Sequence, residues 1–110
     1  MKRFTVRWAE VARDDLDRIV SYIALTSIKN ALAAADRIEK WAESLHTLPN
    51  RGRVVPELER HGISEWRQVT EAPWRLIYRA DKKSVEIVAL VDARRSLEDL
   101  LFERLMHSDW

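Results

Sequence analysis

The chain has 110 residues, of which 46% are hydrophobic and 34% charged, and it contains no cysteine. This balance excludes the disordered class, and the length suits one domain, which we expect to span residues 1–110. Without cysteine, disulfides and thiolate metal sites are excluded, and a reducing compartment is the natural location. A net charge of +1 argues against avid non-specific binding of nucleic acid by the whole surface.

The amino terminus is basic but lacks the apolar core of a secretion signal. Apolar runs also stay well short of the ~20 residues that a membrane helix requires. We therefore expect a cytoplasmic protein that does not contact membranes.

The first half of the chain predicts a strand followed by two helices. Residues 4–8 alternate apolar and polar side chains, which is typical of a short strand. Residues 10–25 then repeat apolar positions every three or four residues, which predicts a helix with one buried stripe. Its acidic residues Asp14, Asp15 and Asp17 lie where carboxylates favour the positive end of a helix dipole.

A second helix is expected from a cap at Asn30 to about Leu48, where Pro49 stops it. The short break between the two amphipathic helices predicts an antiparallel hairpin. Residues 49–64 hold both glycines and two of the three prolines, so we expect a loop there. The apolar stripe of this second helix consists of Ala31, Ala35, Ile38, Ala42 and Leu45.

Residues 65–97 contain three β-rich runs separated by turn residues, which predicts an antiparallel meander. In the middle run, alternation places Arg75, Ile77 and Arg79 opposite the side that can seal a core. The third run is apolar on both faces, as expected of a central strand, and Ser96 is a candidate cap for a short final helix. The whole order predicts an α+β fold, in which the hairpin packs on an antiparallel-rich, four-stranded sheet.

Metal and cofactor chemistry has no support in the sequence. His46, His61 and His107 are scattered without ligand spacing, and neither a phosphate-binding loop nor a nucleophile motif is present. We therefore expect no metal and no cofactor.

Arginines and tryptophans are the candidate binding residues. Arginine forks bind phosphate or carboxylate through paired hydrogen bonds, so an arginine-bearing sheet face predicts a protein docking surface or a clamp for RNA phosphates. The alternative is ordinary cross-strand pairing with glutamates, which contributes about 0.2–1 kcal/mol per pair. Trp110 is a second candidate anchor. The partner-binding candidates are Arg67, Arg75, Arg79, Arg94, Arg95 and Trp66.

Four segments resemble the RelE/ParE superfamily of bacterial toxins, and the chain is most similar to ParE. They are A-R-D-D-L-D-R-I-V-S-Y-I, L-P-N-R-G-R-V-V-P-E-L, W-R-L-I-Y-R and V-E-I-V-A-L-V-D-A-R-R-S-L-E-D-L-L. The resemblance implies a type II toxin–antitoxin module of the plasmid-stabilisation kind, in which ParE-like members inhibit DNA gyrase and RelE-like members cut messenger RNA on the ribosome.

The RNA-cutting relatives imply a site made of a glutamate, an arginine and a final His-Tyr pair. Glu57 and Arg75 match the first two, but Asp92 and Ala93 occupy the His-Tyr positions. Cleavage through the 2′-hydroxyl needs both a proton acceptor and a proton donor, and an ionised aspartate is a poor donor. We interpret the chain as a binding toxin without catalytic residues; if it were an RNase, Glu57, Arg75 and Arg67 would carry the reaction.

The resemblance also implies a cognate ParD-like antitoxin and a toxin–antitoxin hetero-oligomer. Physically, we expect a disordered antitoxin tail to lay a helix or strand into an apolar groove beside the hairpin, with its acidic residues facing the arginines. Two other readings stay open. The chain could be a ribosome-dependent mRNA endoribonuclease, with ribosome and mRNA as partners, or an inactive member that serves only as an interaction partner.

Overall fold

The structure is a computed structural model that describes residues 4–92, 100, 101, 103 and 104. The elements are β1 (Thr5–Trp8), α1 (Glu10–Ala24), α2 (Ile28–Glu43), a 3-10 turn η1 (Ser44–His46), β2 (Arg53–Val54), α3 (Pro56–Glu59), β3 (Trp66–Glu71), β4 (Trp74–Ala80) and β5 (Ser84–Asp92). Within the described residues, every helix is too short or too polar to cross a bilayer.

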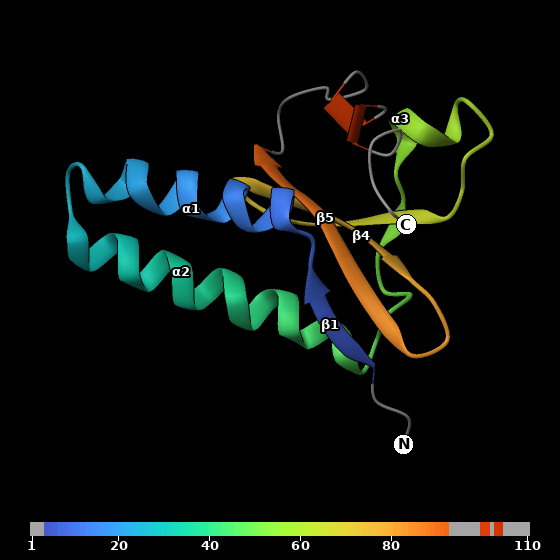
Figure 1. Cartoon of the computed structure of the whole chain (residues 1–110), viewed down its shortest axis with the longest axis horizontal. Coiled ribbons are helices and arrows are strands. Elements are labelled where there is room, and N and C mark those ends of the chain that lie inside the picture. The colour runs from blue at the N-terminus through green and yellow to red at the C-terminus, as the bar shows by residue number, and fades with distance from the viewer. Residues whose placement is uncertain (1–3, 93–99, 102, 105–110) are drawn as a thin grey trace.

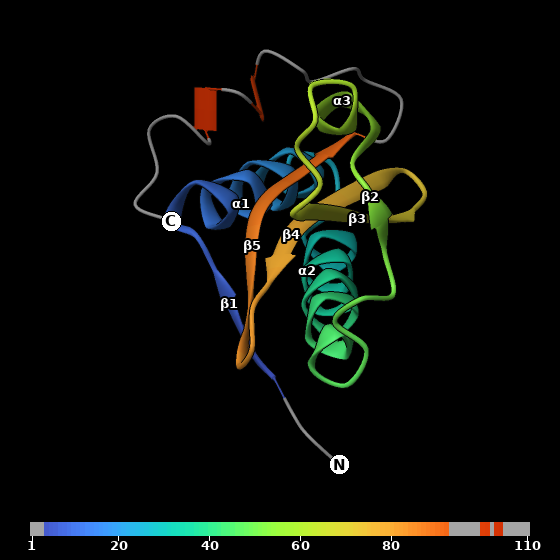
Figure 2. The ribbon, with the colours of Figure 1, turned by 90° about the vertical axis from the view of Figure 1, so that its right-hand side faces the viewer.

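The strands form one mixed sheet in the order β1-β5-β4-β3-β2 (Figures 1 and 2). β1 runs parallel to β5, and the other neighbours are antiparallel. The predicted α+β class is confirmed, but the predicted number of four strands is wrong. The fifth strand, β2, has only two residues and lies with α3 in the segment expected to be a loop, because so short a strand carries no readable alternation.

The predicted helical hairpin is confirmed and covers one face of the sheet, with its far end projecting beyond it (Figure 1). Its second helix begins earlier than expected, because the Ser27 hydroxyl, not Asn30, caps it by accepting the Asn30 N–H at 3.1 Å. That helix ends at Glu43 and continues as η1 rather than reaching Leu48. The buried residues of this face are Ala12, Leu16, Ile38, Ala42, Leu45, Leu76, Tyr78, Val85, Ile87 and Leu90.

The opposite face of the sheet is covered by α3 and by Leu101, which packs into a second core. β5 is therefore covered on both faces, as predicted. Its side chains do not alternate throughout, because a bulge pairs Ile77 with Ala89 and Tyr78 with Ile87, leaving Val88 as the extra residue. Odd-numbered residues before the bulge, such as Ile87, face the hairpin, whereas after it the even-numbered Leu90 does. The buried members of the second core are Val55, Leu58, Trp66, Ile77, Val88, Ala89 and Leu101.

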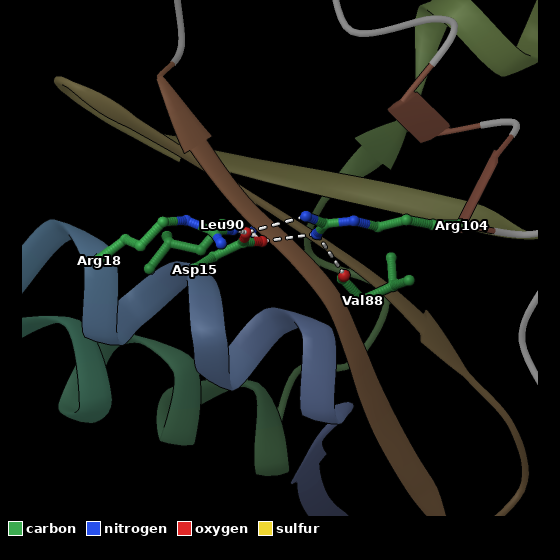
Figure 3. Close-up of polar contacts among 5 residues, drawn as sticks. All are labelled: Asp15, Arg18, Val88, Leu90 and Arg104. Carbon is green, nitrogen blue, oxygen red and sulfur yellow. Dashed lines mark hydrogen bonds and ion pairs between the residues drawn. The ribbon is translucent and has the colours of Figure 1, made fainter.

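Asp15 on α1 joins three distant parts of the chain (Figure 3). Its carboxylate is 5% exposed and accepts two hydrogen bonds from the Arg104 guanidinium, at 2.6 and 2.9 Å, and one from the Leu90 backbone N–H at 3.0 Å. Arg18 donates to it from the solvent side at 2.7 Å, and Arg104 also reaches the Val88 carbonyl at 3.1 Å. Asp15 therefore ties α1 to the β5 bulge and to the C-terminal helical residues, a role that the helix-dipole interpretation did not foresee.

Asp15→Asn tests this junction. The amide keeps the size of the side chain but leaves Arg104, whose side chain is 12% exposed, without its counter-charge. We expect a loss of about 3 kcal/mol in unfolding free energy, measured by urea denaturation. Asp17→Asn, on an exposed position of α1, is the matched control and should stay within about 0.5 kcal/mol of the wild type. Equal stabilities of the two variants would contradict the proposed role of Asp15.

Candidate functional site

Arg75 does not line an exposed docking face. Its guanidinium donates to both carboxylate oxygens of Glu57, each at 2.8 Å, and also to the Gln68 side-chain oxygen. Arg75 is 5% exposed and Glu57 4% exposed. The structure thus brings these two sequence candidates together, but as a buried ion pair that links α3 to β3 and β4. The expectation of an exposed Arg75 is wrong because β2 and α3 cover that part of the sheet.

Burial changes what Glu57 can do chemically. Both of its oxygens are already hydrogen-bonded to a permanently charged guanidinium. A general base must lie within hydrogen-bond reach of the proton that it removes. In this arrangement an RNA 2′-hydroxyl would have to displace Arg75 from a buried site before Glu57 could accept its proton.

Arg67 holds the segment before β2 in place. Its guanidinium donates to the Gly52 carbonyl at 2.7 Å, while the Gly52 N–H donates to the buried Tyr78 hydroxyl at 2.9 Å. A Cβ atom at Gly52 would collide with the carbonyl oxygen of Gln68, so only glycine allows this approach. The same burial raises the pKa of Tyr78, an effect opposed by the Gly52 hydrogen bond and by the charges of Arg67 and Arg51.

Trp66 lies in the second core and is 3% exposed, so in this arrangement it is not a surface anchor. The Arg79 guanidinium lies over its ring at 5.1 Å from the centroid and is partly exposed, as is Arg67. The roles of Arg67 and Arg79 in partner binding therefore stay predictions. Arg94, Arg95 and Trp110 lie outside the described residues, as does Ala93.

A group of exposed apolar side chains at the far end of the hairpin was missed by the sequence reasoning. Tyr22 and Leu25 on or beside α1 are 75% and 80% exposed, and Ile28 and Leu32 on α2 are 71% and 66% exposed. Large apolar patches on a soluble protein mark contact sites. The signal was present in the sequence, because Tyr22, Leu25 and Leu32 fall outside the apolar stripes of the two helices.

A groove of ≈ 440 Å³ lies between α2 and the outer edge of the sheet. Trp41 forms its wall on the α2 side, Arg51 and Arg53 line it from the start of β2 and the segment before it, and Val69 and Thr70 line it from β3. In Figure 2 the segment between α2 and β2 passes alongside this edge. In the part of the chain that the structure describes, no three acidic, histidine or cysteine side chains lie together so that they could hold a metal ion.

The Gly52 contact predicts the effect of Gly52→Ala. Because the added methyl group meets backbone atoms of Gln68, the segment must move, and we expect a loss of about 2–3 kcal/mol in urea denaturation. Gly62→Ala is the contrasting variant. Gly62 has a φ of 78° with no atom within 4 Å of the added carbon, so only its left-handed backbone contributes, about 1 kcal/mol. A smaller loss for Gly52→Ala than for Gly62→Ala would contradict the crowding argument.

The raised pKa of Tyr78 predicts how stability depends on alkaline pH. Above about pH 10 the unfolded chain loses the phenol proton while the folded chain keeps it. The unfolding free energy should therefore fall with rising pH, by up to about 1.4 kcal/mol per pH unit from this residue. Urea denaturation at pH values from 9 to 11.5 should show a shallower decline for Tyr78→Phe. Parallel declines for the two proteins would refute the prediction.

Comparison with known proteins agrees with this fold. Residues 6–97 match the family model described as ParE toxin of type II toxin-antitoxin system, parDE. The curated Toxin ParE3 of Caulobacter vibrioides is 32% identical over 84 residues, which cover 76% of this chain and 80% of that protein. A chain of the solved chromosomal ParDE TA system from P. aeruginosa aligns with a TM-score of 0.66 over 82% of this chain and 96% of its own length, at 24% identity, and shares the fold. The chain belongs to the ParE toxin family of type II toxin–antitoxin systems.

Proposed function

We propose that this ParE-family toxin acts in the cytoplasm by binding and inhibiting DNA gyrase, and that a cognate ParD-like antitoxin neutralises it. The observation that carries the proposal is the state of Glu57. The residue that would serve as the base of an RNA-cutting site is buried and engaged through both oxygens by Arg75. A toxin without a working proton acceptor acts through contact with its target rather than through RNA cleavage.

The position of the proton donor in RNA cleavage also favours a binding toxin over an RNase. RNA-cutting relatives hold a His-Tyr pair where this chain has Asp92 and Ala93. Asp92 ends β5 and pairs with Trp74 of β4. A leaving oxygen must be protonated as the phosphodiester bond breaks, and Ala93 has no side-chain group that could supply that proton.

Two surfaces support an antitoxin partner. The exposed apolar side chains at the end of the hairpin offer contact area for an amphipathic helix, and the groove beside α2 carries Arg51 and Arg53. A disordered segment that folds on binding can place an amphipathic helix on an apolar surface and acidic side chains on arginines. The similarity in fold to a chain of the ParDE TA system from P. aeruginosa supports an antitoxin partner, with which this toxin would form a hetero-oligomer.

A supercoiling assay tests the proposed target. Purified protein should inhibit supercoiling by DNA gyrase, and equimolar antitoxin should restore it. Expression without antitoxin should arrest growth; its failure to do so would point to an inactive family member.

A ribosome-dependent cleavage assay tests the alternative activity. We expect no cutting by the wild type. Cutting that is lost in Glu57→Gln but kept in Glu59→Gln, an exposed neighbour on α3, would overturn the proposal in favour of an mRNA endoribonuclease.

A further inference from the structure

The outer edge of β3 is only partly covered. β2 pairs with it at Arg67 and Gln68, whereas β3 continues to Glu71. On the other side β4 pairs with β3 as far as Glu71, but within the described residues no strand pairs with its outer edge beyond Gln68. Natural sheets usually shorten, charge or cover such edges, because unpaired backbone groups bind further strands.

The register shows which backbone groups are open. The Val55 N–H donates to the Trp66 carbonyl at 3.0 Å, and Arg53 lies opposite Gln68. In an antiparallel pair every second residue turns its N–H and C=O toward the same neighbour. Thr70 is the next residue of that series after Trp66 and Gln68, so its N–H and C=O point away from β4, into the groove.

The groove limits what can bind to this edge. Trp41 on α2 provides an apolar wall, and Arg51 and Arg53, which are both exposed, also line the groove. At the other end Arg37 lies over the Trp74 ring, 5.2 Å from its centroid, and reaches the Ala72 carbonyl at 3.5 Å. Within the described residues, Glu71 is the one acidic side chain that lines the groove. The flanks are therefore mainly positive, with an open backbone edge between them.

We infer that an acidic, extended segment of the antitoxin adds to the sheet as a strand beside β3, pairing with the backbone of Thr70 between Trp41 and the Arg51–Arg53 segment. A peptide backbone supplies the acceptor for the Thr70 N–H and the donor for the Thr70 C=O, and acidic side chains complement the arginines. Single-stranded nucleic acid fits less well. It has no peptide backbone that could form the hydrogen bonds of a paired strand, and Glu71 repels its phosphates. This inference rests on the proposed antitoxin partner and adds where and how one of its segments binds.

Thr70→Pro tests the inference directly. Because the Thr70 N–H faces away from β4, proline removes no hydrogen bond of the existing sheet, and proline is tolerated at such edge positions. Thr70→Ala is the matched control, because it keeps the N–H. By titration calorimetry with the purified cognate antitoxin, we expect Thr70→Pro to weaken binding tenfold or more and Thr70→Ala to remain within twofold of the wild type.

Two further measurements do not depend on the folding of the proline variant. Hydrogen exchange on the wild type should show the Thr70 amide becoming protected when the antitoxin is bound. Arg51→Glu with Arg53→Glu should weaken binding at least tenfold at low salt, whereas Lys82→Glu with Lys83→Glu, the same charge change on the exposed β4–β5 turn, should not.

The outcomes separate this inference from the proposed function. If the wild type binds antitoxin but the Thr70 amide stays unprotected, or Thr70→Pro binds as tightly as the wild type, the added strand is refuted while the antitoxin partner stands. If the wild type binds no antitoxin, both the added strand and the proposed antitoxin partner are refuted. Binding of a single-stranded oligothymidine that is lost in the Arg51/Arg53 variant would replace the peptide with nucleic acid as the occupant.

Discussion

The carboxylate of Asp15 is the point on which the tertiary structure depends. It is buried between α1 and β5, where an unpaired charge would be strongly destabilising, and the Arg104 guanidinium and the Leu90 N–H satisfy it. Removing either charge would leave the other buried. The β5 bulge belongs to the same arrangement, because Arg104 also binds the carbonyl of the extra residue, Val88. A single side chain thus sets the position of the hairpin, the irregular strand and the C-terminal helical residues relative to one another.

A second buried ion pair, between Glu57 and Arg75, has the corresponding role on the opposite face. It joins a four-residue helix to β4, and Gln68 of β3 completes the site. Such a short helix has little stability of its own, so its position depends on contacts of this kind. In an RNA-cutting toxin the same two residue types would serve the reaction. Here they form a buried ion pair, which is the physical reason for proposing inhibition by binding.

The two candidate contact surfaces lie on different parts of the molecule. The end of the hairpin projects beyond the sheet, so its apolar side chains find no partner within the described residues. The groove beside β3 instead combines an open backbone edge with arginines, and Gly52 makes its shape possible because the chain there passes against the Gln68 carbonyl. A disordered partner that folds on binding can cover both surfaces with separate segments. The proposed antitoxin could contact this toxin through both surfaces in this way.

The sequence by itself determined the α+β class, the helical hairpin, the meander and the family, because each depends on a periodicity or motif spread over many residues. It also identified Glu57 and Arg75 as a pair of interest. Only the tertiary structure decided that this pair is buried, that Trp66 lies in a core and that a two-residue strand covers part of β3. The β5 bulge and the Asp15–Arg104 link were likewise invisible in the sequence. Burial and pairing of single side chains depend on segments far apart in the chain, which no local pattern records.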